Sequence, residues 1–261
     1  MYIKYPCYGF VLFVFAFFIS IISAVPTIGI QKDFAGQFPS NGYQSYSAYI
    51  AFPDTSVPGD VTKMSDAQFI NLVKHAYDEM IARWETSLLG PEGCPGAMIG
   101  MESGGRMYFA SSVRSPNAID INAPDADIFQ SVGWFQKVCQ RNGWGTHRTG
   151  GRCAEPNVLR LYGDVNGLVD SPDHPQGVYP KPPRTDTSPR VAVWGRPTDA
   201  NPKEEKETFF PPCANTADNG YGCETLARVY GFKSVSKQTP DGAGEGDWGY
   251  TMGQNPRGAC P

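Results

Sequence analysis

Cysteine and carboxylate side chains stand at spacings that can do chemistry in two stretches of this 261-residue chain. The first, RCAEP at 152–156, separates the thiol of Cys153 from the carboxylate of Glu155 by one residue. The second contains Cys213 and, after nine intervening residues, Cys223. Three thiolates can bind a zinc ion and leave a fourth position for water, as a catalytic site requires. The same cysteines can instead form disulfides, and the residues alone leave both interpretations open.

The thiol of Cys153 and the carboxylate of Glu155 can face one site only where a helix begins. Residues two apart diverge by about 200° on a regular helix, because one turn takes about 3.6 residues. Two glycines at 150–151, together with Pro156 in the first turn, predict a helix entrance at Cys153. A helix N-terminus also lowers the pKa of a thiol, which favours the thiolate that binds metal.

The elements that must position these residues can be located from the spacing of apolar side chains. A capping box of Ser65 and Gln68 opens a helix that reaches Trp84. Helices that alternate with strands predict an α/β domain with one sheet covered by helices. The further elements that we expect are a β-hairpin over 97–113 that turns at 103–105, a helix over 125–144, a helix over 153–162 that ends at Gly163, a strand over 190–195, a helix over 223–231 and a strand over 232–237.

Composition and the first residues indicate the organisation and location of the chain. Hydrophobic residues at 41% suffice for a core, and a net charge of −4 gives no overall basic field for nucleic acid. We expect a cleavable signal peptide at 1–24, and hence a secreted protein that no membrane segment retains after cleavage. The expected remainder is an irregular extension at 25–62, a domain at 63–238 with a Pro-rich insertion at about 164–189, and a Gly-rich tail at 239–261.

Signal cleavage would remove Cys7 and leave six cysteines in the mature chain. An even count in a secreted protein favours disulfides, because the extracellular environment is oxidising. If three of the six hold a metal ion, Cys94, Cys139 and Cys260 remain, and two of these can pair. The cysteine count is therefore compatible with a metal site and with a disulfide framework.

The two cysteine motifs resemble those of the cytidine deaminase-like superfamily of zinc enzymes. The signature of that superfamily is a His or Cys followed by x-Glu, and later Pro-Cys and a second Cys. The match consists of CAE at 153–155, PC at 212–213 and Cys223, in this order. Among its branches, the secreted toxin-type deaminases are the most similar. The resemblance covers the order of elements over about 65–236.

The resemblance implies a three-layer α/β/α deaminase-like sheet, a Zn²⁺ cofactor and a nucleobase-containing substrate. Cys153, Cys213 and Cys223 would hold zinc, which lowers the pKa of water at such a site. Glu155 would take a proton from that water and deliver it to the ring and to the leaving amine. The attacked atom would be C4 of cytosine or C6 of adenine. Backbone N–H groups around Ala154 would hold the carbonyl edge of the base.

The spacing of the last two cysteines differs from the family pattern, in which two to a few residues separate them. A loop that contains Asn215, Asp218 and Gly220 has to bulge out and return for Cys213 and Cys223 to meet. This departure is a reason to keep the disulfide interpretation of both cysteines.

Other features stay open at this point. His147, in the loop before the helix expected over 153–162, is a candidate substrate contact or proton carrier. The sequence does not distinguish cytosine from adenine, or a free nucleoside from RNA or DNA. The alternative functions are a secreted interaction protein stapled by disulfides and an inactive deaminase fold that acts as a binding protein.

Overall fold

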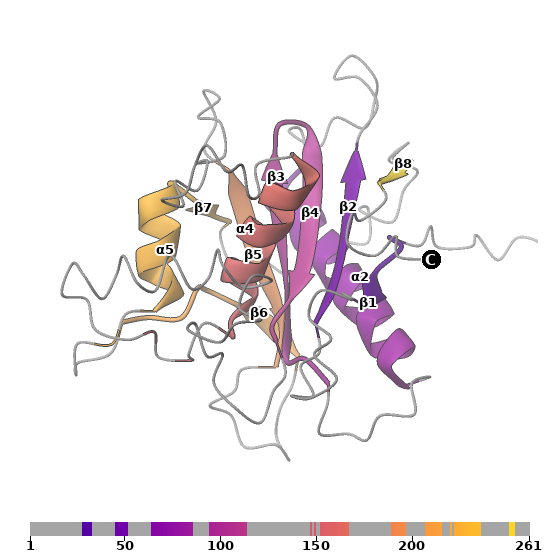
Figure 1. Ribbon diagram of the computed structural model, residues 1–261, viewed down its shortest axis with the longest axis horizontal. Coiled ribbons are helices and arrows are strands. Elements are labelled where there is room, and N and C mark those ends of the chain that lie inside the picture. Colours follow the sequence, from indigo (N-terminus) through magenta and orange to yellow (C-terminus); the bar gives the residue numbers. More distant parts are fainter. Residues whose placement is uncertain are drawn as a thin grey trace, which may run out of the picture.

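A mixed β-sheet with helices packed against it makes up the described part of the protein (Figure 1). The computed structural model describes residues 28–32, 45–51, 64–85, 94–113, 147, 149, 152–166, 189–196, 207–215, 220, 222–235 and 251–253. Strands and helices that belong to one layered unit confirm the predicted α/β class.

The described strands form one eight-stranded sheet with the order β1-β2-β4-β3-β5-β6, in which β7 also pairs with β5 and β8 with β2. Paired strands are antiparallel except for β5 and β7, which run parallel. Their bounds are β1 Gln31–Lys32, β2 Tyr46–Ala51, β3 Ala97–Ser103, β4 Arg106–Ser111, β5 Arg190–Gly195, β6 Thr208–Phe210, β7 Lys233–Ser234 and β8 Thr251–Gly253.

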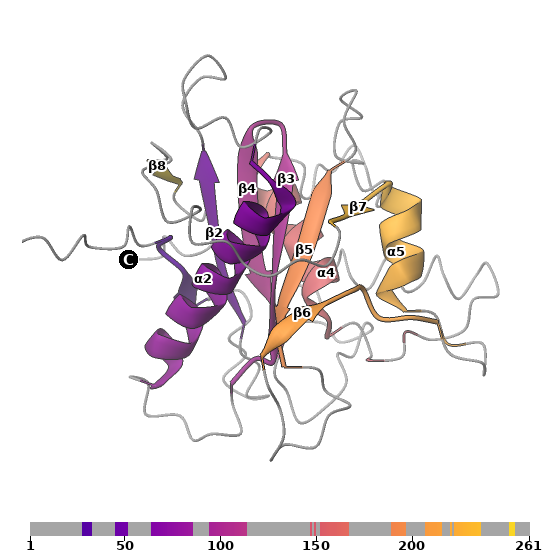
Figure 2. The ribbon, with the colours of Figure 1, turned by 180° about the vertical axis from the view of Figure 1, so that it is seen from behind.

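Helices lie on both faces of the sheet. Helix α2 (Asp66–Glu85) covers one face, and α4 (Ala154–Val165) lies on the other (Figures 1 and 2). Helix α5 (Cys223–Tyr230) contacts α4 and provides the crossover that a parallel pair such as β5 and β7 requires. The hairpin between β3 and β4 turns at the upper end in Figure 1, so β4 ends at the lower end, where α4 and α5 begin.

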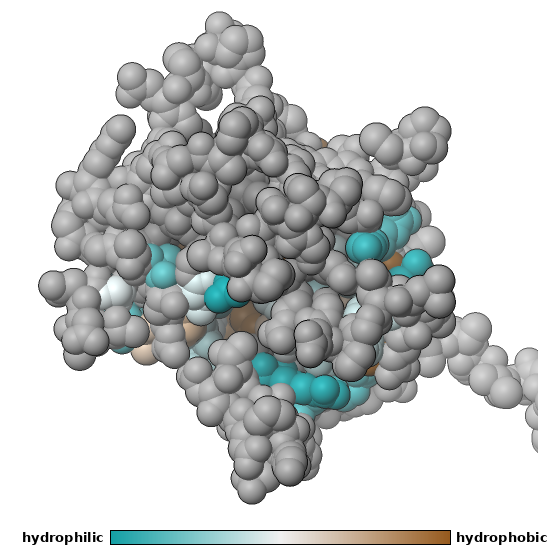
Figure 3. Space-filling view, turned by 60° about the horizontal axis from the view of Figure 1, so that its bottom comes forward, coloured by the Kyte–Doolittle hydropathy of each residue, from teal (hydrophilic) through white to brown (hydrophobic). Residues whose placement is uncertain are grey.

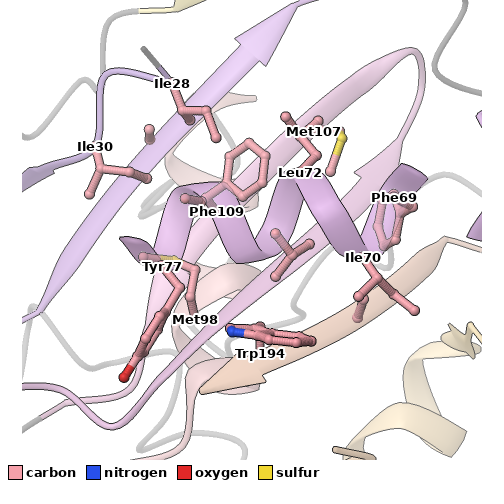
Figure 4. Close-up of a cluster of buried hydrophobic side chains, with 14 of the residues drawn as sticks. Ile28, Ile30, Phe69, Ile70, Leu72, Tyr77, Met98, Met107, Phe109 and Trp194 are labelled. Carbon is pink, nitrogen blue, oxygen red and sulfur yellow. The ribbon is translucent and has the colours of Figure 1, made fainter. Parts of the chain in front are cut away.

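The core beneath α2 is built from large side chains of the helix and of alternate strand positions (Figure 4). Phe69, Val73 and Tyr77 of the helix belong to the same buried cluster as Phe109 and Trp194 of the sheet. The helix approaches β3 closely at Gly100, where an added Cβ would lie 2.4 Å from Cγ2 of Val73. A glycine in β3 therefore lets the helix sit directly on the sheet.

The core beneath α4 uses the opposite side chains of the same strands. Ile99 and Met101 alternate with Met98 along β3 and are buried with Val158 and Leu161 of α4. Strands covered on both faces lose the apolar–polar alternation and become hydrophobic throughout. Both faces of β3 are thus anchored, which fixes α4 relative to the sheet.

The structure confirms the predicted first helix, the hairpin and the helices that begin at Cys153 and Cys223. Ser65 and Gln68 cap α2 reciprocally, with Gln68 N–H donating to Ser65 Oγ (3.2 Å) and Ser65 N–H donating to Gln68 Oε1 (2.9 Å). The hairpin turns through Gly104 and Gly105, whose φ angles are 61° and 72°. Positive φ at both central residues of a two-residue turn matches the right-handed twist of the paired strands.

The expectation of an irregular extension at 25–62 is wrong in part, because this segment supplies β1 and β2. In β2 the small polar Ser47 is as buried as its neighbours Tyr46 and Ala48, so no alternating pattern marks the strand in the sequence. The Gly-rich tail likewise contributes β8, which pairs with β2.

Three further boundaries differ from the prediction. Helix α4 continues past Gly163 to Val165, and this glycine is buried in the structure. Of the strand predicted at 232–237, residues 232–235 are described, and among these β7 comprises Lys233–Ser234. Strand β6 lies in a stretch for which no element was predicted.

A cationic side chain ties α2, β3 and β5 together within the sheet. Arg190 Nε donates to Glu102 Oε2 over 2.9 Å, and Arg190 Nη1 donates to the carbonyl of Met64 over 2.8 Å. Nη1 also lies 3.6 Å from Asp66 Oδ1, and the guanidinium stands 5.2 Å from the ring centre of Phe69. The start of α2 is thereby fixed to β3 and β5.

Several predictions fall outside the described residues, namely the signal peptide at 1–24, the helix over 125–144 and the Pro-rich insertion at about 164–189, of which only residues 164–166 and 189 are described. Within the described segments, every helix is too short or too polar to pass through a lipid bilayer.

Candidate metal centre

Four side chains that can bind a metal ion converge where α4 and α5 begin. They are His147, Cys153, Cys213 and Cys223, and their ligand atoms all lie within 4.8 Å of one another. His147 and Cys223 are buried, whereas Cys153 and Cys213 are partly exposed. The structure thus brings together the three cysteines predicted as ligands and adds a histidine.

Cys153 occupies the residue before the first turn of α4, as the sequence predicts. The carbonyl of Arg152 accepts a hydrogen bond from Val113 N–H (2.9 Å), which ties the helix entrance to the end of β4. Thr149 Oγ1 lies 3.0 Å from Cys153 Sγ. The position of the thiol is therefore set by the sheet on one side and by the preceding loop on the other.

Cys213 reaches Cys223 because its loop folds back over the first turn of α5. The N–H groups of Cys223 and Glu224 donate to Sγ and to the carbonyl of Cys213, each over 3.1 Å. Asn215 Oδ1 accepts hydrogen bonds from Gly222 N–H (2.8 Å) and from Thr225 Oγ1 (2.9 Å). The loop thereby satisfies donors that a helix N-terminus leaves open.

Gly222 allows this close approach. A Cβ at this position would lie 2.2 Å from the carbonyl oxygen of Cys213 and 2.4 Å from that of Ala214. Both contacts are with backbone atoms that a rotamer change cannot move. The nine-residue separation of the two cysteines is thus compatible with a shared site, as the predicted return of the loop requires.

The spacing of the ligand atoms fits a metal ion and does not fit a disulfide. Cys153 Sγ and Cys213 Sγ are 3.8 Å apart, far beyond the bonded distance of about 2.05 Å. Two sulfurs about 2.3 Å from a tetrahedral ion would be about 3.8 Å apart, and a sulfur and an imidazole nitrogen about 3.5 Å. The observed distance from Cys223 Sγ to His147 Nε2 is 3.4 Å. The cluster can therefore hold a metal ion.

Without a cation the three thiols ionise very unequally. Hydrogen bonding, first with Cys153 and then with Cys223, lowers the pKa of Cys213. The hydrogen bond between Cys153 and Cys213 raises the pKa of Cys153, and burial raises the pKa of Cys223. One thiolate is thus stabilised by two thiols, and only a bound cation would favour ionisation of all three.

Glu155 lies in the first turn of α4, close to the cluster. Its side chain is buried, with the residue only 4% exposed. Burial, and secondly the negative charge of Cys213, raises the pKa of Glu155 to about 7, while a hydrogen bond with Cys223 opposes this shift. A buried carboxyl group that titrates near neutral pH beside a possible metal site is suited to proton transfer.

His147 takes a position that the sequence did not predict. The sequence makes it a candidate substrate contact or proton carrier. In the structure its Nε2 atom lies 3.4 Å from Cys223 Sγ, and a ring nitrogen is one of the clustered ligand atoms. The signal in the sequence is that His147 lies six residues before Cys153, and this spacing is not typical of paired metal ligands. Ala154, whose backbone was expected to contact the base, is buried in the first turn of α4.

The described cysteines of the cluster do not pair with one another in disulfides. Cys139 and Cys260 lie outside the described residues, so their pairing and that of Cys94 stay predictions. At the end of the molecule where α4 and α5 begin, described hydrophilic and hydrophobic residues reach the surface in small separate areas (Figure 3).

No family model, no curated protein and no solved structure matches this chain.

Proposed function

We propose that the protein is a secreted, zinc-dependent hydrolytic deaminase that acts on a nucleobase in a nucleoside, a nucleotide or a nucleic acid. The observation that carries this proposal is the buried carboxyl group of Glu155 beside Cys153, Cys213 and Cys223. A metal site that serves only to stabilise a fold needs no buried acid in its vicinity. Hydrolysis with proton transfer does need one.

Zinc is the ion that this donor set favours. Thiolate and imidazole ligands in a tetrahedral spacing are typical of zinc sites, whereas calcium and magnesium prefer oxygen ligands. Zinc, when bound, supplies the Lewis acidity that makes water at the site easier to deprotonate. The loop geometry at Gly222 and Asn215 supports Cys213 and Cys223 as ligands of one ion.

The role of Glu155 is proton transfer between water and substrate. Its carboxylate accepts a proton as water attacks the amino-bearing carbon of the ring and passes this proton to the ring nitrogen. It then takes a second proton, from the new hydroxyl group, and delivers it to the departing amine. The C–N bond breaks, a C=O bond replaces it, and ammonia leaves. Burial raises the pKa of Glu155 toward neutral pH, which suits a group that both accepts and donates protons.

The order of elements supports a deaminase-like layering. The order along the chain is helix α2, hairpin β3–β4, helix α4, strand β5, helix α5 and strand β7, with the short strand β6 between β5 and α5. Apart from β6, this is the order that the resemblance implies. Cys153 directly precedes α4 and Cys223 is the first residue of α5, so two of the three cysteines mark helix starts. Helices on both faces of the sheet agree with the three-layer arrangement proposed for this class.

The test is ammonia release by zinc-loaded protein from cytosine and adenine in nucleosides, nucleotides, single-stranded RNA and single-stranded DNA. Glu155→Gln should retain zinc and lose turnover, since it preserves shape and removes the proton carrier. Glu224→Gln is the matched control, because this acid follows a ligand residue but is exposed. Undiminished turnover in Glu155→Gln would refute the mechanism.

A second candidate is an inactive deaminase fold whose metal only stabilises a binding protein. The observation that favours it is His147, because four protein ligands complete a tetrahedral zinc site and leave no position for water. Bound zinc together with absence of ammonia release from every substrate class, in the wild type and in His147→Ala, would favour this candidate.

A further inference from the structure

The two ring nitrogens of His147 face different surroundings. Nε2 lies 3.4 Å from Cys223 Sγ, and one ring nitrogen lies within 4.8 Å of all three sulfurs. Nδ1 lies 3.0 Å from Thr149 Oγ1 and 3.2 Å from Thr149 N. The histidine is 6% exposed, so the ring is held between the sulfur cluster and one threonine.

We propose that His147 is a fourth, displaceable protein ligand of the metal through Nε2, and that Thr149 is the positioning residue that holds the ring there. The resting site is then closed to water, and His147 has to leave the metal before water and substrate can enter. The ligand assignment stands by itself, whereas the need for displacement rests on the proposed deaminase function.

The geometry favours a ligand over a simple hydrogen-bond donor. A donor to Cys223 needs proximity to one sulfur only, but a ring nitrogen of His147 lies within 4.8 Å of all three. The 3.4 Å between Nε2 and Cys223 Sγ and the 3.8 Å between Cys153 Sγ and Cys213 Sγ are the separations that a common tetrahedral ion imposes. One histidine with three cysteines is also a frequent ligand set for zinc.

Thr149 offers the imidazole a hydrogen-bond partner in either of its two neutral tautomers. When Nε2 binds metal, the proton resides on Nδ1, which donates to Thr149 Oγ1 over 3.0 Å. When Nε2 is released and the ring proton is transferred from Nδ1 to Nε2 through water, Nδ1 accepts from Thr149 N–H over 3.2 Å, and Nε2–H donates to Cys223 Sγ. His147 can therefore leave the metal by a small shift and a change of tautomer, with its hydrogen bonds replaced.

The same threonine connects the histidine to a cysteine ligand. Its Oγ1 lies 3.0 Å from His147 Nδ1 and 3.0 Å from Cys153 Sγ. Partners of this kind orient metal ligands, and their loss typically lowers metal affinity by about 10- to 100-fold. Thr149→Val, which keeps the shape and removes the hydroxyl, should weaken metal binding by about tenfold.

Cobalt(II) in place of zinc reports the number and type of ligands through its absorption spectrum, without any need for turnover. We expect the wild-type cobalt protein to show a four-coordinate spectrum that added imidazole does not change. His147→Ala should bind one cobalt with a shifted spectrum, and added imidazole should restore the wild-type bands. His75→Ala, a substitution on α2, is the control and should behave as the wild type.

A wild-type spectrum that responds to imidazole in the same range as that of His147→Ala would overturn the ligand assignment. Should His147→Ala fail to fold, ¹⁵N-NMR of the histidine ring in the intact zinc protein decides the same question. A metal-bound Nε2 with a proton on Nδ1 supports the assignment, and a proton on Nε2 contradicts it.

Activity measurements separate this inference from the proposed function. If His147 closes an active site, His147→Ala should release ammonia faster than the wild type at saturating zinc. Cobalt spectra that show a histidine ligand, with no ammonia release from either protein, would leave the ligand assignment intact and refute the deaminase. Ammonia release from a wild type without a histidine ligand would refute the inference and leave the deaminase intact.

Discussion

The backbone N–H of Cys223 donates a hydrogen bond to Sγ of Cys213 over 3.1 Å, at the first turn of α5. One cysteine thus caps the helix that the other begins, so the two sulfurs are held together by backbone contacts before any metal binds. Hydrogen bonds with the thiols of Cys153 and Cys223 lower the pKa of Cys213 most, and this backbone contact lowers it further. A preformed thiolate at a helix N-terminus is the natural first ligand for a cation.

Gly222→Ala tests the contact between the Cys213 loop and the first turn of α5. The new methyl group would meet the carbonyl oxygens of Cys213 and Ala214 at 2.2 and 2.4 Å, so the loop has to move away from α5. We expect at least about tenfold weaker zinc binding, measured by competition with a chelator, and a loss of about 1–3 kcal/mol in the free energy of unfolding. Gly96→Ala is the control, since its nearest foreign atom would be 3.6 Å away. Equal zinc affinity in both variants would show that this contact does not position the metal ligands.

Gly100→Ala tests the seating of α2 on the sheet. Its Cβ would lie 2.4 Å from Cγ2 of Val73, and overpacking of this kind costs about 1–3 kcal/mol of unfolding free energy. Val73→Ala removes the obstructing methyl groups, so the double variant should lose less stability than the sum of the two single variants. Urea unfolding of the four proteins measures this coupling. Strict additivity would show that the helix does not contact β3 at this glycine.

Arg190→Met should destabilise the fold strongly, because it leaves Glu102 with a buried carboxylate and no cation. Glu102 and Arg190 have side chains that are 9% and 15% exposed. Removing one partner of such a pair costs about 3 kcal/mol or more. Arg196→Met breaks the exposed pair with Glu207, where the side chains are 49% and 30% exposed, and should cost below about 1 kcal/mol. Similar unfolding midpoints in urea for the two variants would be inconsistent with the buried pair.

The raised pKa of Glu155 predicts a pH dependence in the metal-free protein. The folded state favours the protonated acid, because burial and the charge of Cys213 raise the pKa from 4.5 to about 7. The stability contributed by this proton uptake is present below about pH 4.5 and is lost as the pH rises to about 7. Glu155→Gln has no carboxyl group at this position. Its free energy of unfolding should therefore rise by about 3 kcal/mol relative to that of the wild type between about pH 4.5 and about pH 7.

Urea unfolding of metal-free protein at several pH values measures this difference. Glu224→Gln provides the control, because its carboxylate is exposed and should leave the pH profile parallel to that of the wild type. A constant difference between Glu155→Gln and the wild type from pH 4.5 to 7 would mean that Glu155 is ionised throughout. The acid–base role would then lose its basis.

Local signals in the sequence were sufficient for the elements that position the site. The capping box at Ser65 and Gln68, the two glycines of the hairpin and the apolar spacing of α4 and α5 act over a few residues, and all four elements are present. The pairing of Cys153 with Glu155 at a helix entrance depends on the same kind of local information. These features were predictable because neighbouring residues determine them.

The strands at the ends of the chain and the fourth ligand depend on contacts that are remote in sequence. Strand β2 is recognisable only through its pairing with β4 and β8, since buried Ser47 interrupts its apolar pattern. His147 becomes a ligand candidate because the loop from Cys213 returns to α5, which brings Cys223 within 3.4 Å of its ring. The sequence indicates that this loop has to return for Cys213 and Cys223 to meet, but it does not indicate that His147 lies beside them.

The most direct measurement of the central claim is the zinc content of protein purified without chelator, for the wild type and for Cys153→Ser. We predict close to one zinc per wild-type chain and substantially less in the variant, because Cys153 contributes one of the clustered sulfurs. A metal-free wild type in which peptide mass analysis finds Cys153, Cys213 or Cys223 in disulfides would contradict the metal centre and the enzyme proposed on it.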